Sequence, residues 1–253
     1  MGASFEPAKA ALVALPNPRT KYAKSLKNLS PLYVPKLYLL LAAVVLVLVC
    51  VAKPQGVDSD ARVLIDGLDF APSIKMSGIS QQLIGGGTRL KYNVVKIYAV
   101  GVYMDAAGAK RALKPYLGLA AGALQKQAGF YKAVIEARFA KALLLYFHRS
   151  VGSSAVVDAL RDSLAPRLKA PSLAKFREVL QQMLGDSVPK GSQLFFSCRG
   201  DNLHMSVSSS SSPLLMQDKT ICAALFDVYL GSSPISMQAK EGFTLGFAER
   251  VGA

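Results

Sequence analysis

A dense run of apolar and β-branched residues, VVKIYAVGVYM from Val94 to Met104, most constrains how this chain can fold. Such a run is typical of a β-strand that is buried over most of its surface. Lys96 and Tyr98 interrupt its apolar character, and three glycines followed closely by Arg89 precede it. The run predicts a strand inside the domain, and the polar residues in and before it are the first candidates for a functional site.

After Arg62 the chain alternates between strand and helix patterns. RVLIDGLDF and the region 132–151, which is densest in apolar residues at Leu143–Phe147, predict strands. The segment Gly108–Lys132 is rich in Ala, Leu, Lys and Gln and predicts helix. Further on, Arg199-Gly200-Asp201 between two strand-like segments predicts a β-hairpin. Residues 220–231 predict a helix that ends at Gly231, and the segment after it predicts a last helix.

Two more helices are predicted before that hairpin. Ser153 or Ser154 is the expected N-cap of the first, and Pro171-Ser172 opens the second. Their apolar residues recur at helical spacing and are expected to pack in the core: Val156, Val157, Leu160, Leu164 and Leu168 in the first, and Leu173, Phe176, Val179, Leu180 and Met183 in the second. The order of elements predicts an α+β fold, with long antiparallel strands and helices grouped on one face.

The N-terminal part of the chain differs from this domain. Residues 1–36 are basic and acid-poor, a composition that cannot bury enough apolar surface to fold alone. Leu37–Ala52 then has no charged residue over 16 positions, just short of the minimum of about 17 for crossing a bilayer. It predicts an uncleaved membrane anchor or a targeting segment cleaved after Ala52. A buried core helix is a third, less favoured interpretation.

We therefore expect a basic leader at 1–36, a hydrophobic helix at 37–52, a linker at 53–60 and a folded domain at 61–253. The protein would be held at a membrane by its single N-terminal helix, or lie in a plastid after cleavage of the targeting segment. The domain is expected to fold without the N-terminal part, because the two share no compositional pattern.

The charge balance limits the possible partners. The chain has a net charge of +14, which suggests nucleic acid or an anionic membrane. Residues 1–53 hold seven of the cations against one acid, and the remaining excess is scattered without a basic block. This distribution argues against nucleic-acid binding.

Metal and cofactor chemistry is not indicated. Cys50, Cys198 and Cys222 form no C-x-x-C pair, so we expect neither a metal site nor a disulfide. His148 and His204 are isolated in the sequence, and no serine lies in a nucleophile elbow. The glycines at 85–87 match neither phosphate-loop spacing and precede a strand rather than a helix.

Arg89 is the cation whose position asks for an explanation. A half-buried guanidinium needs an anionic or strongly hydrogen-bonding partner, because an unpaired buried charge is costly. The partner is either an acid of the chain itself or the carboxylate of a ligand. The residues alone favour an internal salt bridge and leave both alternatives open.

The segment GGGTRLKYNVVKIYAVGVYMD, Gly85 to Asp105, resembles a characteristic segment of the chalcone isomerase family: a Gly-x-Arg turn, then a lysine, an aromatic residue and Ala-x-Gly-x-Tyr. The similarity continues into FHRSVGSSAVVDALRDSL, KGSQLFFSCRGDNLHMSV and DVYLGSSPIS, so that it covers the chain from about Arg62 onward. The resemblance implies an open-faced β-sandwich, in which a helical layer covers a large antiparallel sheet and a ligand cleft lies between them.

The family includes enzymes that close a chalcone to a flavanone, non-catalytic relatives and plastid proteins that bind fatty acids. The family's arginine is present as Arg89. Where the enzymes carry polar substrate-binding groups, this chain has Tyr98, Val156, Ser163 and Val228. The resemblance therefore implies binding of a long-chain fatty acid or similar apolar carboxylate, with Arg89 and Tyr98 at the carboxylate and the other three lining the cleft.

The alternative is a chalcone–flavanone isomerase, an intramolecular lyase, or a related enone-cyclising enzyme. A non-catalytic partner of other enzymes is a third possibility. No cofactor is expected in any of these.

Binding of a carboxylate by Arg89 and Tyr98 requires two local features of the chain. In an uninterrupted strand Arg89 and Tyr98 would face opposite sides of the sheet, so a bend or bulge is needed near Lys91–Asn93. The glycines at 85–87 are expected to let ligand and backbone approach closely.

Overall fold

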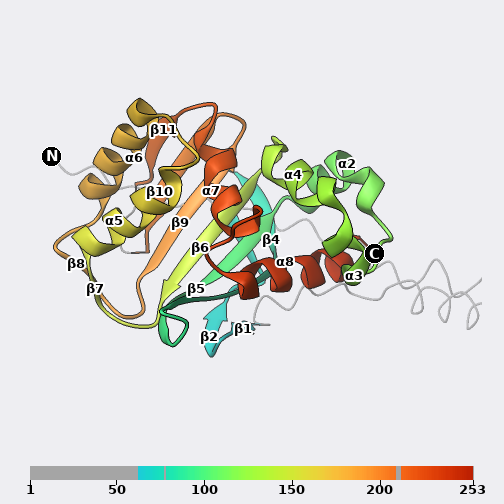
Figure 1. Ribbon diagram of the computed structural model, residues 1–253, viewed down its shortest axis with the longest axis horizontal. Coiled ribbons are helices and arrows are strands. Elements are labelled where there is room, and N and C mark those ends of the chain that lie inside the picture. Colours follow the sequence, from blue (N-terminus) through green and yellow to red (C-terminus); the bar gives the residue numbers. More distant parts are fainter. Residues whose placement is uncertain (1–61, 77, 209–211, 253) are drawn as a thin grey trace, which may run out of the picture. The chain divides into compact units, whose positions relative to one another are not determined.

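The computed structural model describes residues 62–76, 78–208 and 212–252 (Figure 1). These residues belong to a compact unit that begins at Asp58. The expected leader at 1–36, the hydrophobic helix Leu37–Ala52 and the linker at 53–60 lie outside the described residues, so they stay predictions. Within the described ranges, no helix has both the length and the apolar character needed to cross a bilayer.

A seven-stranded antiparallel sheet forms the centre of the domain, in the order β11-β10-β9-β6-β5-β4-β3. The strand bounds are β3 Ser73–Met76, β4 Ile79–Lys91, β5 Val95–Met104, β6 Lys141–Phe147, β9 Gln193–Arg199, β10 Asn202–Val207 and β11 Leu214–Gln217. Two small hairpins accompany the sheet: β1 (Val63–Ile65) with β2 (Leu68–Phe70), and β7 (Val151–Gly152) with β8 (Ser187–Val188). The strand predicted at Val94–Met104 is β5.

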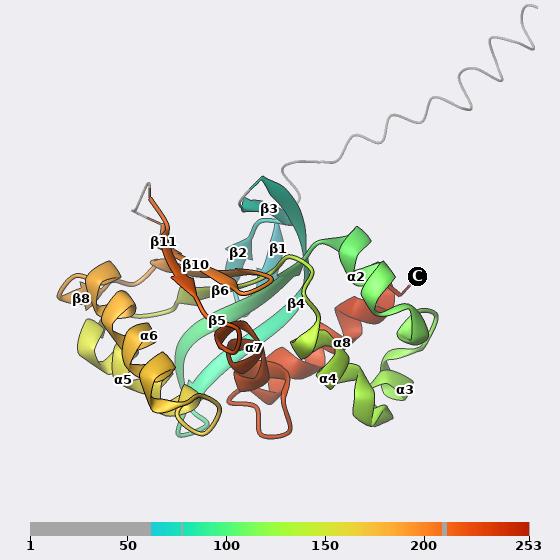
Figure 2. The same cartoon turned by 90° about the horizontal axis from the view of Figure 1, so that it is seen from above.

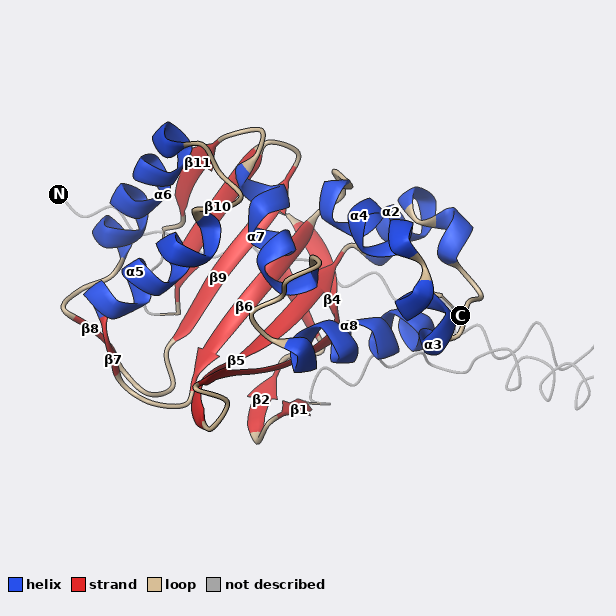
Figure 3. Cartoon of the chain, viewed as in Figure 1, coloured by secondary structure: helices blue, strands red, loops and turns tan. Residues whose placement is uncertain are grey.

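The helices lie on one face of this sheet, and the β1–β2 hairpin lies on the other (Figures 2 and 3). The helix bounds are α2 Ala106–Ala112, α3 Ala121–Lys126, α4 Ala128–Glu136, α5 Ser153–Leu164, α6 Ala170–Met183, α7 Ile221–Leu230 and α8 Met237–Arg250, with a short 3₁₀ helix at Lys114–Tyr116. The α+β prediction is confirmed.

β5 is apolar without alternation because both of its faces are buried. Val100 and Val102 belong to the large core between the sheet and the helices, and neither is exposed to solvent. Ala99 and Tyr103 point the other way, into a smaller cluster beneath the β1–β2 hairpin. A strand covered on both faces has no reason to alternate polar and apolar residues.

Two of the three glycines of β4, Gly85 and Gly87, are explained by helix α8. A Cβ atom on Gly85 would overlap the carbonyl oxygen of Gly242, and one on Gly87 would overlap the backbone of Gln238 and Ala239. The same is true in the other direction. A Cβ atom on Gly242 of α8 would overlap the carbonyl oxygen of Gly86, and one on Gly246 would overlap the carbonyl oxygen of Ile84. The prediction that these glycines admit a ligand is therefore corrected, because the close approach is between two backbones.

Local predictions for a turn, a helix start and a strand have different outcomes in the structure. The hairpin at Arg199–Asp201 joins β9 to β10, and Gly200 has a φ of 60° as its turn requires. The helix predicted from Ser153 is α5, but its N-cap position is Gly152 and no side chain caps it. The strand predicted from residue 132 was wrong up to Glu136, because Lys132–Glu136 is the end of α4 and buries Val134 in the core.

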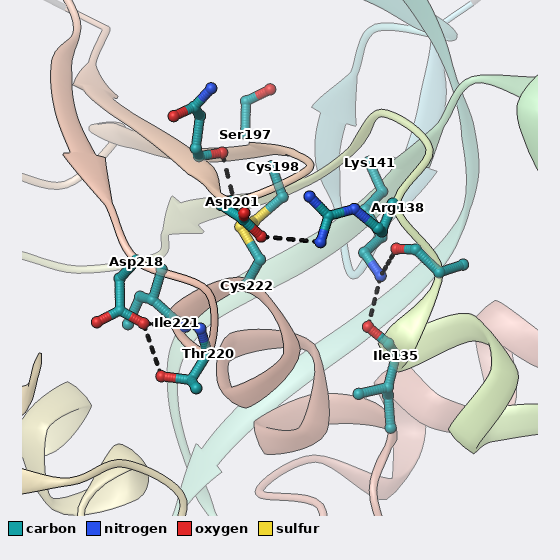
Figure 4. Close-up of a disulfide and its surroundings, with 12 residues drawn as sticks. Ile135, Arg138, Lys141, Ser197, Cys198, Asp201, Asp218, Thr220, Ile221 and Cys222 are labelled. Atoms are coloured by element: carbon teal, nitrogen blue, oxygen red, sulfur yellow. Dashed lines mark hydrogen bonds and ion pairs between the residues drawn. A yellow bond between two sulfur atoms is a disulfide. The ribbon is translucent and has the colours of Figure 1, made fainter.

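A disulfide links Cys198 on β9 to Cys222 on α7 (Figure 4). The prediction that no disulfide forms was wrong, because it rested on the absence of a C-x-x-C pair. The two cysteines are 24 residues apart in sequence. A strand of the sheet and a helix of the covering layer bring them together, and their bond ties these layers to each other.

Lys141 is a buried lysine close to this disulfide (Figure 4). It lies on β6, and its ammonium group donates to the carbonyl oxygens of Val134, Ile135 and Ala137 at 2.6, 2.7 and 2.9 Å. These carbonyls are at the end of α4, where helices leave acceptors without partners and favour positive charge. Lys141 therefore closes the C-terminus of α4, while burial lowers its pKa to about 7.

The depressed pKa of Lys141 predicts a pH dependence of stability. Its unfolded value is 10.5 and its folded value is about 7, so between these values the unfolded chain binds more protons than the folded one. The free energy of unfolding should therefore rise with pH over this window. Urea denaturation at several pH values should show this rise, and it should be smaller in Lys141→Met. Lys132→Met, at an exposed position of α4, is the control and should keep it.

Candidate functional site

A cavity of about 210 Å³ lies between the sheet and helix α5. Strands β4, β5 and β6 supply one side of it, and α5 supplies the other. Most of its lining is apolar and includes Ile97, Leu145, Phe147, Val156, Leu160 and Ile235. Its polar lining consists of Arg89, Lys91, Tyr98 and Ser163, so the cavity is an apolar space with a positively charged side.

Arg89 and Tyr98 face this cavity together. They are direct cross-strand partners on β4 and β5, and opposite residues of an antiparallel pair point to the same face. The bend expected near Lys91–Asn93 is present: Tyr92 and Asn93 form the turn with φ values of 53° and 58°. A register shift between Arg89 and Leu90 adds a bulge beside it.

The half-buried guanidinium of Arg89 is held by backbone groups. Its Nη1 donates to the carbonyl oxygens of Leu90 and Ile235, at 2.7 and 3.0 Å. Among the described residues, none of the ion pairs includes Arg89. The internal salt bridge that the sequence favoured is therefore not found in this part of the chain. No acidic residue lines the cavity either, so the site favours an anion.

Two buried tyrosines meet next to the arginine. The hydroxyl groups of Tyr98 on β5 and Tyr229 on α7 are 2.9 Å apart. Burial raises the pKa of both, and the nearby charge of Arg89 only partly opposes this. Both phenols are therefore neutral near pH 7 and each carries one hydrogen. When Tyr229 donates to Tyr98, the Tyr98 hydroxyl keeps its hydrogen for a group in the cavity.

The other three predicted residues have different positions. Val156 and Ser163 of α5 both line the cavity. The Ser163 hydroxyl donates to the carbonyl oxygen of Ala159 at 2.7 Å, so its hydrogen is used within its own helix. Val228 was predicted to line the cleft but is 1 % exposed in the core and is absent from the lining. The helix turns by about 100° per residue, and the next residue, Tyr229, is the one that contacts Tyr98.

Sequence reasoning missed three residues of the site. Lys91 follows Arg89 at the spacing of two that places side chains on one face of a strand, and this signal was available. Tyr229 is one residue from the position chosen on α7, so a one-residue change of helix register would have found it. Ile235 lies between α7 and α8 and contributes through its backbone carbonyl, which no side-chain pattern indicates.

Comparison with known proteins supports this picture. No family model matches the chain. The chalcone–flavanone isomerase of Gentiana triflora is 23 % identical over 214 residues, which cover 77 % of this chain and 96 % of that protein. The chalcone–flavanone isomerase of Oryza sativa subsp. japonica is 25 % identical over 216 residues, 76 % of this chain and 91 % of that protein. Fatty-acid-binding protein 1 of Arabidopsis thaliana is 23 % identical over 188 residues, which cover 70 % of this chain and 66 % of that protein.

A solved structure shows the same fold. The crystal structure of the Arabidopsis thaliana fatty-acid binding protein AtFAP1 superposes with a TM-score of 0.64 at 22 % identity, and covers 76 % of this chain and 99 % of that one. The resemblance to the chalcone isomerase family that the sequence predicted is confirmed by these comparisons, and the domain has the chalcone isomerase-like fold.

Proposed function

We propose that this chalcone isomerase-like protein binds a long-chain fatty acid, or a similar apolar carboxylate, without catalysing a reaction. The carboxylate lies against Arg89 and accepts a hydrogen bond from Tyr98, and the acyl chain lies among the apolar residues of the cavity. The observation that carries this proposal is a half-buried arginine in an apolar cavity, with no acidic partner among the described residues. The names of one relative and of the structural neighbour add support.

The two ends of such a ligand contribute differently. Each buried methylene stabilises the complex by about 0.8 kcal/mol, and a hydrogen bond to a charged group by about 1.5–3 kcal/mol. The tail thus supplies most of the affinity, and Arg89 selects for an acid. At about 210 Å³ the cavity is smaller than the usual range of roughly 300–1,000 Å³ for ligand sites. A long chain therefore needs neighbouring side chains to move, or continues toward the opening.

The test is a binding series on the full chain, with saturated fatty acids of increasing length and the matching fatty alcohols. Affinity should rise with each methylene and level off once the cavity is filled. Each acid should bind at least about tenfold more tightly than its alcohol, the factor that corresponds to about 1.4 kcal/mol. Equal affinity for acid and alcohol would show that the carboxylate does not contribute to binding, and would contradict the proposed role of Arg89. Mass spectrometry of co-purifying small molecules then identifies the natural ligand.

Tyr98→Phe is expected to weaken carboxylate binding by about 1 kcal/mol, the net contribution of one neutral hydrogen bond. Tyr229→Phe should cost less, because Tyr98 keeps its own hydroxyl for the ligand. Isothermal titration with one fatty acid measures both. Tyr103→Phe is the control, since that buried phenol bonds to Ala71 beneath the other face of the sheet and should not affect affinity. A larger loss in Tyr229→Phe than in Tyr98→Phe would contradict this arrangement.

The second candidate function is chalcone–flavanone isomerisation, which two relatives carry in their names. Two features favour binding over catalysis. Val156 is apolar where the family resemblance implies a polar substrate group, and the Ser163 hydroxyl is bonded within α5. We expect no ring closure of a hydroxylated chalcone above the uncatalysed rate. An absorbance assay that shows clear acceleration would favour the enzyme instead.

The place where the protein acts stays a prediction. Leu37–Ala52 is proposed to hold it at a membrane, or to direct it to a plastid before cleavage after Ala52. Sequencing the N-terminus of the mature protein distinguishes the two.

A further inference from the structure

The turn between β4 and β5 exposes two large apolar side chains to solvent. Tyr92 is 81 % exposed and Val94 is 75 % exposed, the highest values for large apolar side chains in the described part of the chain. We refer to Tyr92, Asn93 and Val94 as the hairpin tip. The turn that carries them projects from the lower end of the sheet in Figure 1.

The backbone of the hairpin tip does not explain why a tyrosine is present. The N–H of Val94 donates to the carbonyl oxygen of Lys91 at 3.3 Å and closes a tight turn, with both Tyr92 and Asn93 in the left-handed region. Glycine and asparagine adopt this conformation readily, whereas a bulky side chain there is uncommon. The Tyr92 ring is thus held in solvent at some conformational cost, with the Lys91 ammonium 5.2 Å from its centre.

The hairpin tip stands at the entrance of the proposed ligand site. Lys91 and Ile97, on either side of the tip, both line the cavity that holds Arg89. Lys91 is also exposed to solvent, so the cavity opens beside the tip. Whatever contacts Tyr92 and Val94 therefore lies next to the route by which a ligand enters.

Positive charge surrounds this entrance. Lys91 and Lys96 flank the tip, and both are exposed. Arg149 and Lys190 are exposed near the adjoining strand end, where His148 N–H bonds to the carbonyl oxygen of Ile97 and Lys190 N–H bonds to Ser150. Among the described acids, Asp66 forms an ion pair with Lys96 and lies 3.0 Å from the imidazole of His148, and Asp186 is exposed beside β8. The four cations named here outnumber these two acids.

We propose that the hairpin tip contacts the surface of an anionic phospholipid bilayer, with Tyr92 and Val94 in the headgroup region and the surrounding cations at the lipid phosphates. Tyrosine suits this interface because its ring is apolar and its hydroxyl is polar. Exposed lysines and arginines are attracted to anionic lipid. The contact brings the cavity entrance to the bilayer, where apolar carboxylates are dissolved. This role in the uptake of a ligand from the bilayer rests on the proposed function, whereas the membrane contact itself does not.

The absence of tryptophan from the sequence allows a direct test in the full chain. Tyr92→Trp places the sole indole at the hairpin tip. Leu215→Trp places it on β11, at a side chain that is 56 % exposed, and is the matched control. Both variants are mixed with vesicles of phosphatidylglycerol and phosphatidylcholine whose acyl chains are brominated. Leu37–Ala52 is the same in both variants, so any membrane contact by that segment does not distinguish them.

We expect the Tyr92→Trp variant to shift its emission to the blue and lose most of its fluorescence, and the Leu215→Trp control to change little. The quenching should weaken when phosphatidylcholine replaces phosphatidylglycerol and when salt is raised. Quenching of neither variant, equal quenching of both, or equal quenching in neutral vesicles would overturn the proposal. So would a blue shift that follows protein concentration without lipid, because the tip would then contact a second copy. If Tyr92→Trp does not fold, Val94→Trp serves the same purpose.

A second measurement separates this inference from the proposed function. Tyr92→Ser/Val94→Ser should bind a fluorescent fatty acid in solution with unchanged affinity but receive it from anionic vesicles several-fold more slowly. An unchanged transfer rate in this double variant overturns the inference and leaves fatty-acid binding intact. Absence of fatty-acid binding by the unmodified protein, with the tip indole still entering the bilayer, would instead refute the proposed function and leave the membrane contact standing.

Discussion

Replacing Gly246 with alanine is expected to destabilise the folded domain by about 3 kcal/mol or more, at the upper end of what overpacking a core costs. The added Cβ atom would overlap the carbonyl oxygen of Ile84 on β4. Neither atom can rotate away, because the backbone of α8 fixes the position of the Cβ atom and the oxygen belongs to the backbone of β4. Helix α8 would have to move off the sheet, and Phe243 and Phe247, which it buries in the core, would move with it.

Gly122→Ala is the matched control for this substitution. Gly122 also lies in a helix, α3, but a Cβ atom there would meet nothing within 4 Å. Alanine is the better helix former by up to about 1 kcal/mol, so this variant should be as stable as the unmodified protein or slightly more so. Thermal and urea denaturation followed by circular dichroism measure both. A Gly246→Ala variant as stable as Gly122→Ala would show that α8 does not pack directly on β4.

Local patterns predicted most of the fold. β5 was evident because burial on both faces removes alternation, and α5 and α6 were evident from apolar stripes at helical spacing. The hairpin of β9 and β10 followed from a turn with glycine at the position that needs a positive φ. In each of these cases the signal lies within a short stretch of consecutive residues, and packing agrees with local preference.

Contacts between distant segments were not predictable in this way. Gly85 and Gly87 stand out in the sequence, but helix α8, which packs against them, lies at the other end of the domain sequence, at Met237–Arg250. Cys198 and Cys222 meet only because α7 packs on the sheet beside β9. Lys141 looks like an ordinary charged residue in the sequence, and only the end of α4 explains its burial. Each of these depends on which helix covers which strand.

The candidate site was predicted in part from the sequence. The family resemblance indicated Arg89 and Tyr98, while parity along a single strand argued against them. The turn at Tyr92–Asn93 resolves this, because the two residues belong to neighbouring strands and are paired in register. On α7 the resemblance indicated Val228, which is one residue away from the residue that forms the contact. Tyr229, and not Val228, contacts Tyr98.

Arg89→Ala is expected to weaken fatty-acid binding by about 2–4 kcal/mol, because the ligand's carboxylate would remain in the cavity without a charged partner. This corresponds to an affinity roughly 30-fold to 1,000-fold lower. Arg89→Lys should lose less, since the charge remains while the planar arrangement of donors is lost. Arg149→Ala is the control, because Arg149 is an exposed cation near the same end of the sheet and does not line the cavity.

The stability of these variants decides between the two roles of Arg89. The arginine donates to two backbone carbonyls, those of Leu90 and Ile235, so Arg89→Ala should also lower the free energy of unfolding by about 1 kcal/mol. A ligand anchor predicts that the loss in affinity exceeds this loss in stability. A purely structural arginine predicts the opposite order, in which the domain is destabilised and binds fatty acid at full strength. Titration and urea denaturation of the same three variants measure both quantities, and full-strength binding by Arg89→Ala would exclude Arg89 as the carboxylate anchor.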